Sequence, residues 1–265
     1  MGNVLNHFEN IFRGNTFDRQ LSPLDTLLLN DIIAHISEQL GREFFLHPQT
    51  GKVVAIAEGV DWDTPWLFVK PDPTMLCKVY QMCALKANFI HSRCLGCWKV
   101  VARPKTLEEL ITAFDIMEGL GLHCKAGIEE RTWVQATGQL YGCYFYCKSK
   151  AHGIEVAEKV RTAFDAELPK VEIYLKQYCT EFELKFGPGS KYQRPPLADR
   201  LEPMIMDMFE TEKTRACHPW YVRAHILLKW LRFAADHGDQ TFKLFTDGEP
   251  AYNPIEKVYV PQGGM

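Results

Sequence analysis

Two cysteines separated by two residues, Cys94 and Cys97, are the strongest chemical signal in this sequence. A C-x-x-C pair presents two thiolates on one tight turn, as Zn²⁺ and iron–sulfur clusters require of a protein. Cys77, Cys83 and His91 precede the pair, so one short segment could supply several ligands. No second C-x-x-C completes a zinc-ribbon pattern. The spacing therefore predicts a cysteine-ligated metal centre, but no motif names its reaction.

Geometry narrows the choice of ligands. Residues six positions apart on a helix point about 120° away from each other, so only one of Cys77 and Cys83 should face the metal, and we expect Cys83. Cys179 lies in a segment, residues 171–186, that we expect to pair with the strand beginning after Cys97. The predicted ligands are Cys83, Cys94, Cys97 and Cys179, and the expected cofactor is an iron–sulfur cluster, with zinc as the alternative.

The other cysteines have a simpler interpretation. Free cysteine is among the most buried residue types and packs as a small apolar side chain. The cysteines expected in the core are Cys124, Cys143, Cys147 and Cys217.

An alternative ligand set contains His91. If His91 took the place of Cys83, three cysteines and one histidine would favour Zn²⁺ over a cluster.

Length and composition indicate a globular chain in a reducing compartment. The sequence has 265 residues, is 46% hydrophobic, and has an odd count of nine cysteines. Its start lacks the basic and apolar pattern of a signal peptide, so we expect a cytoplasmic protein. The formal net charge of −3 gives no overall attraction to nucleic acid. No apolar run approaches the roughly 20 residues of a membrane span, so we expect no membrane partner.

Helix and strand patterns predict an α+β protein with three regions. Residues 1–90 should form an N-terminal helix, capped by Ser22, and a β-hairpin that lead to the cysteine motif. Residues 91–190 contain two successive β-α-β units, which predict a ferredoxin-like βαββαβ core with a four-stranded antiparallel sheet and two helices on one face. Residues 191–265 should form a C-terminal helical region and a tail with one late strand.

The elements of the predicted core follow from local patterns. A capping box, Thr106-x-x-Glu109, begins one helix, and residues 153–168 should form the other. The predicted strands are residues 98–103, 127–135, 140–147 and 171–186.

Side-chain alternation predicts a charged, open face on this sheet. If Trp98, Val100 and Ala102 face the helices, Lys99 and Arg103 lie on the opposite face. The next predicted strand offers Glu129 and Arg131 on one side, and paired basic and acidic groups near a metal are what an enzyme uses to bind an anionic substrate and to move protons. We therefore expect an enzyme acting on a small anionic substrate. Lys99, Arg103 and Tyr141 are the predicted substrate-binding residues, and Lys125 and Arg131 are the predicted catalytic residues.

Two other functions are compatible with the sequence. Tyr141, Gly142 and Tyr146 partly match the aromatic pattern with which RNA-recognition motifs stack bases, which predicts a zinc-stabilised nucleic-acid-binding module. A metal-free interaction protein with core cysteines is the third possibility. The sequence contains no dinucleotide-binding, P-loop, nucleophile-elbow or zinc-protease motif, which argues against nucleotide-binding folds and the common hydrolases.

Overall fold

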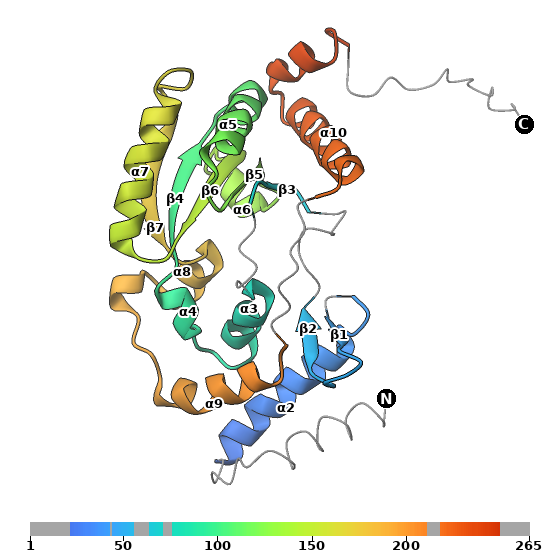
Figure 1. Ribbon diagram of the computed structural model, residues 1–265, viewed down its shortest axis with the longest axis vertical. Coiled ribbons are helices and arrows are strands. Elements are labelled where there is room, and N and C mark those ends of the chain that lie inside the picture. Colours follow the sequence, from blue (N-terminus) through green and yellow to red (C-terminus); the bar gives the residue numbers. More distant parts are fainter. Residues whose placement is uncertain (1–21, 43, 56–63, 71–75, 211–217, 250–265) are drawn as a thin grey trace, which may run out of the picture.

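The computed structural model describes residues 22–42, 44–55, 64–70, 76–210 and 218–249, which form a mixed α and β structure (Figure 1). A five-stranded antiparallel sheet occupies one part of it, and a group of helices with a small hairpin occupies the other. The predicted α+β class is confirmed at this level. Cys217 and most of the predicted tail lie outside the described residues.

The sheet has the strand order β3-β5-β6-β4-β7. Each neighbouring pair is antiparallel, and β4 lies between β6 and β7. Trp98 is paired with Gln177 and Arg103 with Glu172, so the predicted pairing of the segment after Cys97 with the segment near Cys179 is confirmed. The strands are β3 (Trp66–Phe68), β4 (Trp98–Arg103), β5 (Cys124–Ile128), β6 (Tyr141–Cys147) and β7 (Glu172–Gln177).

Three helices share an apolar core with one face of this sheet: α5 (Leu107–Leu120), α7 (Lys150–Phe164) and α10 (Trp220–Asp236). The Thr106 side chain accepts a hydrogen bond from the backbone N–H of Glu109, as the predicted cap requires. Val100 and Ala102 point into this core, as alternation along β4 predicts. The opposite face of the sheet is therefore left to contact the rest of the chain.

A second apolar cluster is built from helices and a hairpin. Its helices are α2 (Pro23–Glu38), α3 (Cys77–Lys86), α4 (Ser92–Leu95) and α9 (Pro196–Asp207), and its hairpin pairs β1 (Phe44–Leu46) with β2 (Val53–Ala55). The predicted C-terminal region contributes to both clusters, since α9 packs in the second and α10, followed by the 3₁₀ helix η3 (Gln240–Phe245), packs in the first.

Two predicted strands end earlier than expected. β5 ends at Ile128, and the short helix α6 (Thr132–Gln135) occupies the second half of the predicted strand. β7 ends at Gln177, and α8 (Thr180–Phe186) follows it, so the predicted strand 171–186 is half helix. The backbone of Tyr178 adopts a positive φ of 52°, which breaks the extended chain between the two elements. A short 3₁₀ helix, η2 (Gly189–Lys191), lies beyond α8.

Gly127 allows β3 to pack tightly at the edge of the sheet. A Cβ atom at this position would lie 2.2 Å from the carbonyl oxygen of Pro65, a distance that no real side chain tolerates. Glycine is therefore required at the position of β5 that pairs with Trp66, the first residue of β3.

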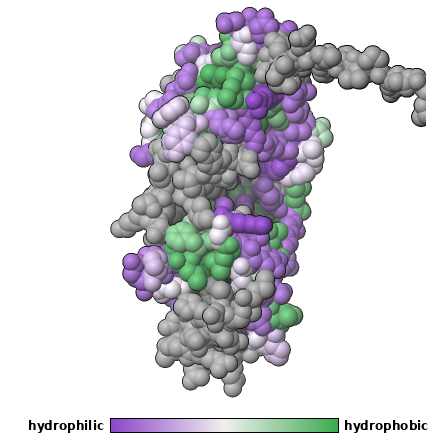
Figure 2. Space-filling view, turned by 90° about the vertical axis from the view of Figure 1, so that its right-hand side faces the viewer, coloured by the Kyte–Doolittle hydropathy of each residue, from purple (hydrophilic) through white to green (hydrophobic). Residues whose placement is uncertain are grey.

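One face of the molecule mixes polar and apolar side chains. Figure 2 shows one face on which apolar side chains gather in separate patches among hydrophilic ones. Within the described ranges, no helix combines the length and apolar character needed to cross a bilayer.

The N-terminal cap of α2 contains a buried carboxylate. Asp25 is 1% exposed and completes a capping box with Ser22, and both of its oxygens accept hydrogen bonds from Arg200 of α9, at 2.9 and 3.0 Å. The hydrogen bond from Arg200 lowers the pKa of Asp25 below its ordinary value of 3.8, although burial opposes this shift. The carboxylate thus ties the first helix of the described chain to α9.

This pair predicts a pH-dependent contribution to stability. Because the folded pKa of Asp25 is lowered, its contribution is complete above the ordinary pKa and is lost as the pH falls through the folded value. Asp25→Asn should lower the free energy of unfolding by about 2 kcal/mol at neutral pH, and by a smaller amount at about pH 2.5, which lies below the ordinary pKa. Urea denaturation at both pH values measures this. Asp31→Asn, an exposed position on the same helix, is the control. An equal loss for Asp25→Asn at both pH values would contradict the account.

Candidate functional site

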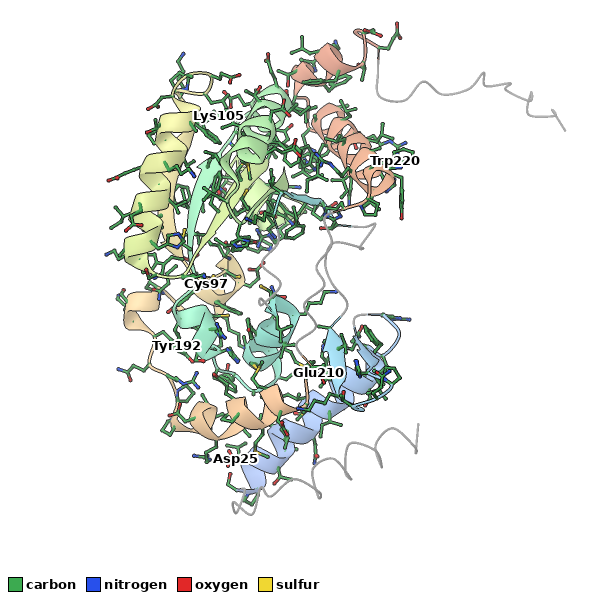
Figure 3. All side chains as sticks on the ribbon, viewed as in Figure 1. Asp25, Cys97, Lys105, Tyr192, Glu210 and Trp220 are labelled. Carbon is green, nitrogen blue, oxygen red and sulfur yellow. The ribbon has the colours of Figure 1, made fainter. Side chains whose placement is uncertain are left out.

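A cavity of about 400 Å³ lies between α3, α4 and α8 and the face of the sheet opposite the core helices. Figure 3 places Cys97 at this junction, between the sheet and the helices of the second cluster. The strand residues that line the cavity, including Trp66, Lys99, Lys125 and Tyr144, all belong to the face that the three core helices leave uncovered. The cavity therefore lies at the sheet surface opposite the core helices, where alternation predicted Lys99. This face is not open as predicted, because α3, α4 and α8 lie over it and Lys99 and Arg103 are buried.

Four cysteines line this cavity: Cys77, Cys94, Cys97 and Cys179. We call them the cavity cysteines. Cys77 is the first residue of α3, Cys94 lies in α4, and Cys97 directly precedes β4. Cys179 is the N-cap residue of α8. Cys94 and Cys97 are buried, Cys77 and Cys179 are partly exposed, and all four are free thiols. Segments more than 80 residues apart in the sequence thus bring thiols to one space.

The thiols influence one another electrostatically. Burial is the main cause that raises the pKa of Cys94, and Cys179, Cys77 and Cys97 each raise it further. Burial likewise raises the pKa of Cys97, against the opposing effect of Lys99. In the described part of the chain, no three His, Cys, Asp or Glu side chains stand close enough together to hold a single metal ion.

Lys99 brings a buried positive charge to the cysteines. Its side chain is 7% exposed, and its ammonium group donates a hydrogen bond to the sulfur of Cys179 over 3.0 Å. The ammonium also lies 5.6 Å from the centre of the Tyr146 ring. Burial lowers the pKa of Lys99, but negative charge on Cys179 and Cys97 raises it more, so that its pKa lies well above the ordinary value. The sequence predicted Lys99 as a substrate-binding residue, and the structure places it at the wall of the cavity.

A polar network fixes the turn that presents Cys94. Glu202 of α9 accepts hydrogen bonds from the backbone N–H and the hydroxyl of Ser92, and it pairs with Arg194 at 2.8 Å. His91 caps α4 by accepting a hydrogen bond from the N–H of Arg93. The start of α4, the helix that carries Cys94, is therefore attached to α9 of the second cluster.

His91 does not line the cavity, so the structure does not bring it to the cavity cysteines. Its ring is buried and stacks on the ring of Tyr80 at 4.2 Å. Burial lowers the pKa of His91 to about 4, although Glu202 opposes the shift. A neutral, buried imidazole in this position acts as a helix cap.

The other side of the site is held by the end of β7. The backbone N–H of Tyr178 donates a hydrogen bond to the carbonyl of Cys97 at 3.0 Å, and the Gln177 side chain donates one to the carbonyl of Leu95 at 2.7 Å. Tyr178 is 1% exposed and has a positive φ, which is costly for a bulky residue. This bend turns the chain so that Cys179 faces the cavity.

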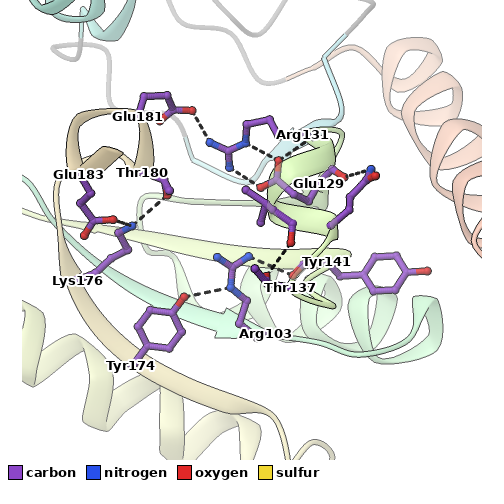
Figure 4. Close-up of polar contacts among 12 residues, drawn as sticks. Arg103, Glu129, Arg131, Thr137, Tyr141, Tyr174, Lys176, Thr180, Glu181 and Glu183 are labelled. Atoms are coloured by element: carbon purple, nitrogen blue, oxygen red, sulfur yellow. Dashed lines mark hydrogen bonds and ion pairs between the residues drawn. The ribbon is translucent and has the colours of Figure 1, made fainter. Parts of the chain in front are cut away.

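Charged side chains form the rest of the wall. Arg131 binds both oxygens of Glu129 and also contacts Glu181 of α8, as Figure 4 shows. Lys125 lies over the rings of Trp66 and Phe68, at 4.5 and 5.3 Å from their centres. The two predicted catalytic residues, Lys125 and Arg131, therefore line the same cavity as Lys99 and the cavity cysteines.

Three predicted site residues lie elsewhere. Cys83 is fully buried in the second cluster, where burial raises its pKa to about 12. Arg103 is buried further along β4 and donates a hydrogen bond to the Tyr174 hydroxyl at 3.2 Å. Tyr141 is fully buried in the sheet-and-helix core, and its hydroxyl donates a hydrogen bond to Asp239 at 2.6 Å.

The positions of Cys83 and Tyr141 have physical reasons, and Arg103 is held away from the cavity by its hydrogen bonds to the Tyr174 hydroxyl and the Tyr141 carbonyl. α3 turns the face that carries Cys83 towards its own apolar cluster, so Cys77 reaches the cavity in its place. Tyr141 and Tyr146 are five residues apart on one strand and therefore point to opposite faces. Tyr146 lines the cavity, whereas Tyr141 joins the core.

The structure adds residues that the sequence analysis missed. Cys77 is one of them, because the helix geometry allows only one of Cys77 and Cys83 to face the metal and the sequence analysis expects Cys83 there. The two acidic partners of Arg131 also line the cavity. Glu129 directly follows β5, and Glu181 lies in α8, a segment predicted as strand. Aromatic side chains from four elements and the chain beside them complete the wall: Trp66, Phe68, Tyr80, Tyr144, Tyr146, Tyr178 and Phe182.

Three of the cysteines predicted in the core are buried there: Cys124, Cys143 and Cys147. Burial raises the pKa of Cys124 to about 12 and that of Cys147 to about 11. These thiols pack as apolar groups between the sheet and its helices, as predicted.

No family model, no curated protein and no solved structure matches this chain. Any function must therefore be inferred from the side chains around the cavity.

Proposed function

We propose that the cavity holds a metal centre ligated by Cys77, Cys94, Cys97 and Cys179. The observation that supports this most directly is that these four cysteines, from separate segments, line one cavity. Cys77 replaces Cys83 in the ligand set expected from the sequence. Metal coordination would also give the buried thiols a role, because binding removes their protons and converts them to thiolates.

We favour an iron–sulfur cluster over zinc. A single zinc ion needs its ligands converging at about 2.3 Å from the metal, and the described side chains offer no such group. A cluster is larger, so its four thiolates stand further apart around it. The cavity of about 400 Å³ has room for the larger cofactor.

Lys99 supports a negatively charged centre. A buried ammonium group is costly unless a negative charge or strong hydrogen-bond acceptors compensate it. The contacts of Lys99 with described residues are a hydrogen bond to the Cys179 sulfur and the Tyr146 ring, and they include no carboxylate. Thiolate ligands would supply the missing charge. A hydrogen bond to a ligand sulfur is also one of the means by which proteins set the potential of a cluster.

We propose that the centre serves an enzyme acting on a small anionic substrate. Lys99, Lys125 and Arg131 bring positive charge to the cavity. The carboxylates of Glu129, Glu130 and Glu181 also line it. In this proposal Lys99 orients the substrate, while Lys125 and Arg131 stabilise developing negative charge. A reducing cytoplasm is the setting in which the cavity cysteines are expected to stay free for metal binding.

The finer fold assignment is also a proposal. We infer that β4 to β7, with α5 and α7, form a ferredoxin-like core to which β3 adds an edge strand. The order β5-β6-β4-β7 and the packing of both helices on one face support it. We do not extend the proposal to RNA binding, since Tyr141 lies in the core and Tyr146 faces a cavity bounded by α3 and α8.

Metal removal tests the proposed centre. The four ligands tie α3, α4 and the start of α8 to the end of the sheet, so treatment with dithionite and a strong chelator should lower the melting temperature by at least about 5 °C. Calorimetry before and after treatment, with readdition of iron and sulfide, measures this. A metal-free interaction protein predicts no change, and that outcome would remove the proposal.

A further inference from the structure

Arg131 has one permanent partner and one exchangeable partner. Glu129 is 1% exposed and holds the guanidinium by two hydrogen bonds, from Nε and from one terminal nitrogen. Glu181 contacts the other terminal nitrogen, and its side chain is 46% exposed. Ion pairs between exposed groups contribute little free energy because water competes for both partners. The contact with Glu181 is thus the weaker one and can be replaced.

The position of Glu181 relates this contact to the cavity. Glu181 lies two residues after Cys179, and both side chains line the cavity, as does Arg131. Its carboxylate reaches across to the guanidinium, as Figure 4 shows. A carboxylate that enters the cavity would therefore find a guanidinium nitrogen already oriented towards an oxygen acceptor.

The other residues that line the cavity indicate what the rest of such a ligand, apart from its carboxylate, should be. Trp66 and Phe68 lie on the same side of the cavity under the Lys125 ammonium, and Tyr80 and Phe182 also line it. Aromatic side chains around the anion site favour a ligand with a planar apolar group, because such a group packs against them and is removed from water.

We propose that the cavity binds a small planar carboxylic acid whose carboxylate replaces Glu181 on Arg131. Glu181 then occupies the anion site in the ligand-free protein and competes with the ligand. The inference rests on the proposed function in one respect: the bound acid is the anionic substrate of that site and lies beside the cavity cysteines.

The test is a calorimetric titration of the full-length, anaerobically purified protein with benzoate, with benzamide as the neutral analogue. Benzoate should bind saturably and benzamide at least about tenfold more weakly. Glu181→Gln should tighten benzoate binding about fivefold, because it removes the competing charge. Glu183→Gln is the matched control: Glu183 lies on the same helix but pairs with Lys176 and does not line the cavity, so affinity should stay unchanged.

A second variant tests the guanidinium itself. Arg131→Lys keeps a positive charge beside buried Glu129 but removes the planar guanidinium and its several N–H donors. It should weaken benzoate binding about tenfold. Equal binding of benzoate and benzamide, absence of saturable benzoate binding, or affinities that do not respond to Glu181→Gln and Arg131→Lys would overturn the inference.

Metal content is measured on every sample, which separates the two proposals. If metal is present and the affinity for benzoate is the same in these variants as in the parent protein, only the proposed carboxylate site is wrong. If metal is absent and the variants shift benzoate affinity as expected, the carboxylate site stands and the metal centre is wrong.

Discussion

Cys77→Ala should abolish metal binding, whereas Cys83→Ala, six residues along the same helix, should leave the metal content of the purified protein unchanged. Cys77 begins α3 at the edge of the cavity, and Cys83 is fully buried on the face of α3 that packs in the second cluster. Loss of one of four thiolates from a cluster leaves an open coordination position, and such centres are commonly lost during purification.

The measurement is iron, zinc and acid-labile sulfide per chain, together with the circular dichroism of each variant. Because Cys83 is buried, its substitution should lower stability modestly, by about 1 kcal/mol, without affecting the metal. Metal lost in Cys83→Ala and retained in Cys77→Ala would show that the ligand set expected from the sequence is the correct one.

Arg131→Met should lower the free energy of unfolding by about 3 kcal/mol, the largest stability effect that we expect at the cavity. The reason is the burial of Glu129, whose side chain is 1% exposed and whose charge is compensated by Arg131. Without the guanidinium, a charged carboxylate would remain in a position that water hardly reaches.

A double-mutant cycle separates this charge effect from lost packing. The double variant Arg131→Met with Glu129→Gln removes both charges and should lose clearly less stability than Arg131→Met alone. Urea denaturation of the parent protein, both single variants and the double variant gives the coupling energy. If the losses of the two single variants simply add in the double variant, the pair does not depend on mutual charge compensation.

Local signals in the sequence were sufficient for much of the fold. Ser22 and Thr106 cap the helices they were expected to cap, because capping depends on residues within one turn. The position of Lys99 on the face opposite the core helices follows from the alternation of side chains along one strand. These features require no knowledge of distant parts of the chain.

Features that depend on tertiary packing were not accessible in the same way. Whether Cys77 or Cys83 faces the cavity depends on which side of α3 packs against the second cluster, and the helix itself has cysteines on both sides. Cys179 was placed near Cys97 correctly, but on a long strand; the bend at Tyr178 and the start of α8 have no strong local signal.

Tyr141 is a different case, because the sequence did contain the signal. Five residues separate it from Tyr146, an odd spacing that places the two rings on opposite faces of a strand. The resemblance of the segment to an aromatic base-stacking pattern included both rings, although alternation along a strand places only one of them on the face opposite the core helices. The contact between Arg131 and Glu181, by contrast, joins residues 50 positions apart and could only be found from the structure.

The most direct test of the central claim is the composition of the native protein after anaerobic purification. An ultraviolet–visible spectrum is recorded on the same sample as elemental analysis for iron, sulfide and zinc. The account predicts a brown protein with broad absorption near ~400 nm and matched amounts of iron and sulfide. A colourless protein with one zinc per chain would contradict the cluster, and a protein with neither metal would contradict the metal centre altogether.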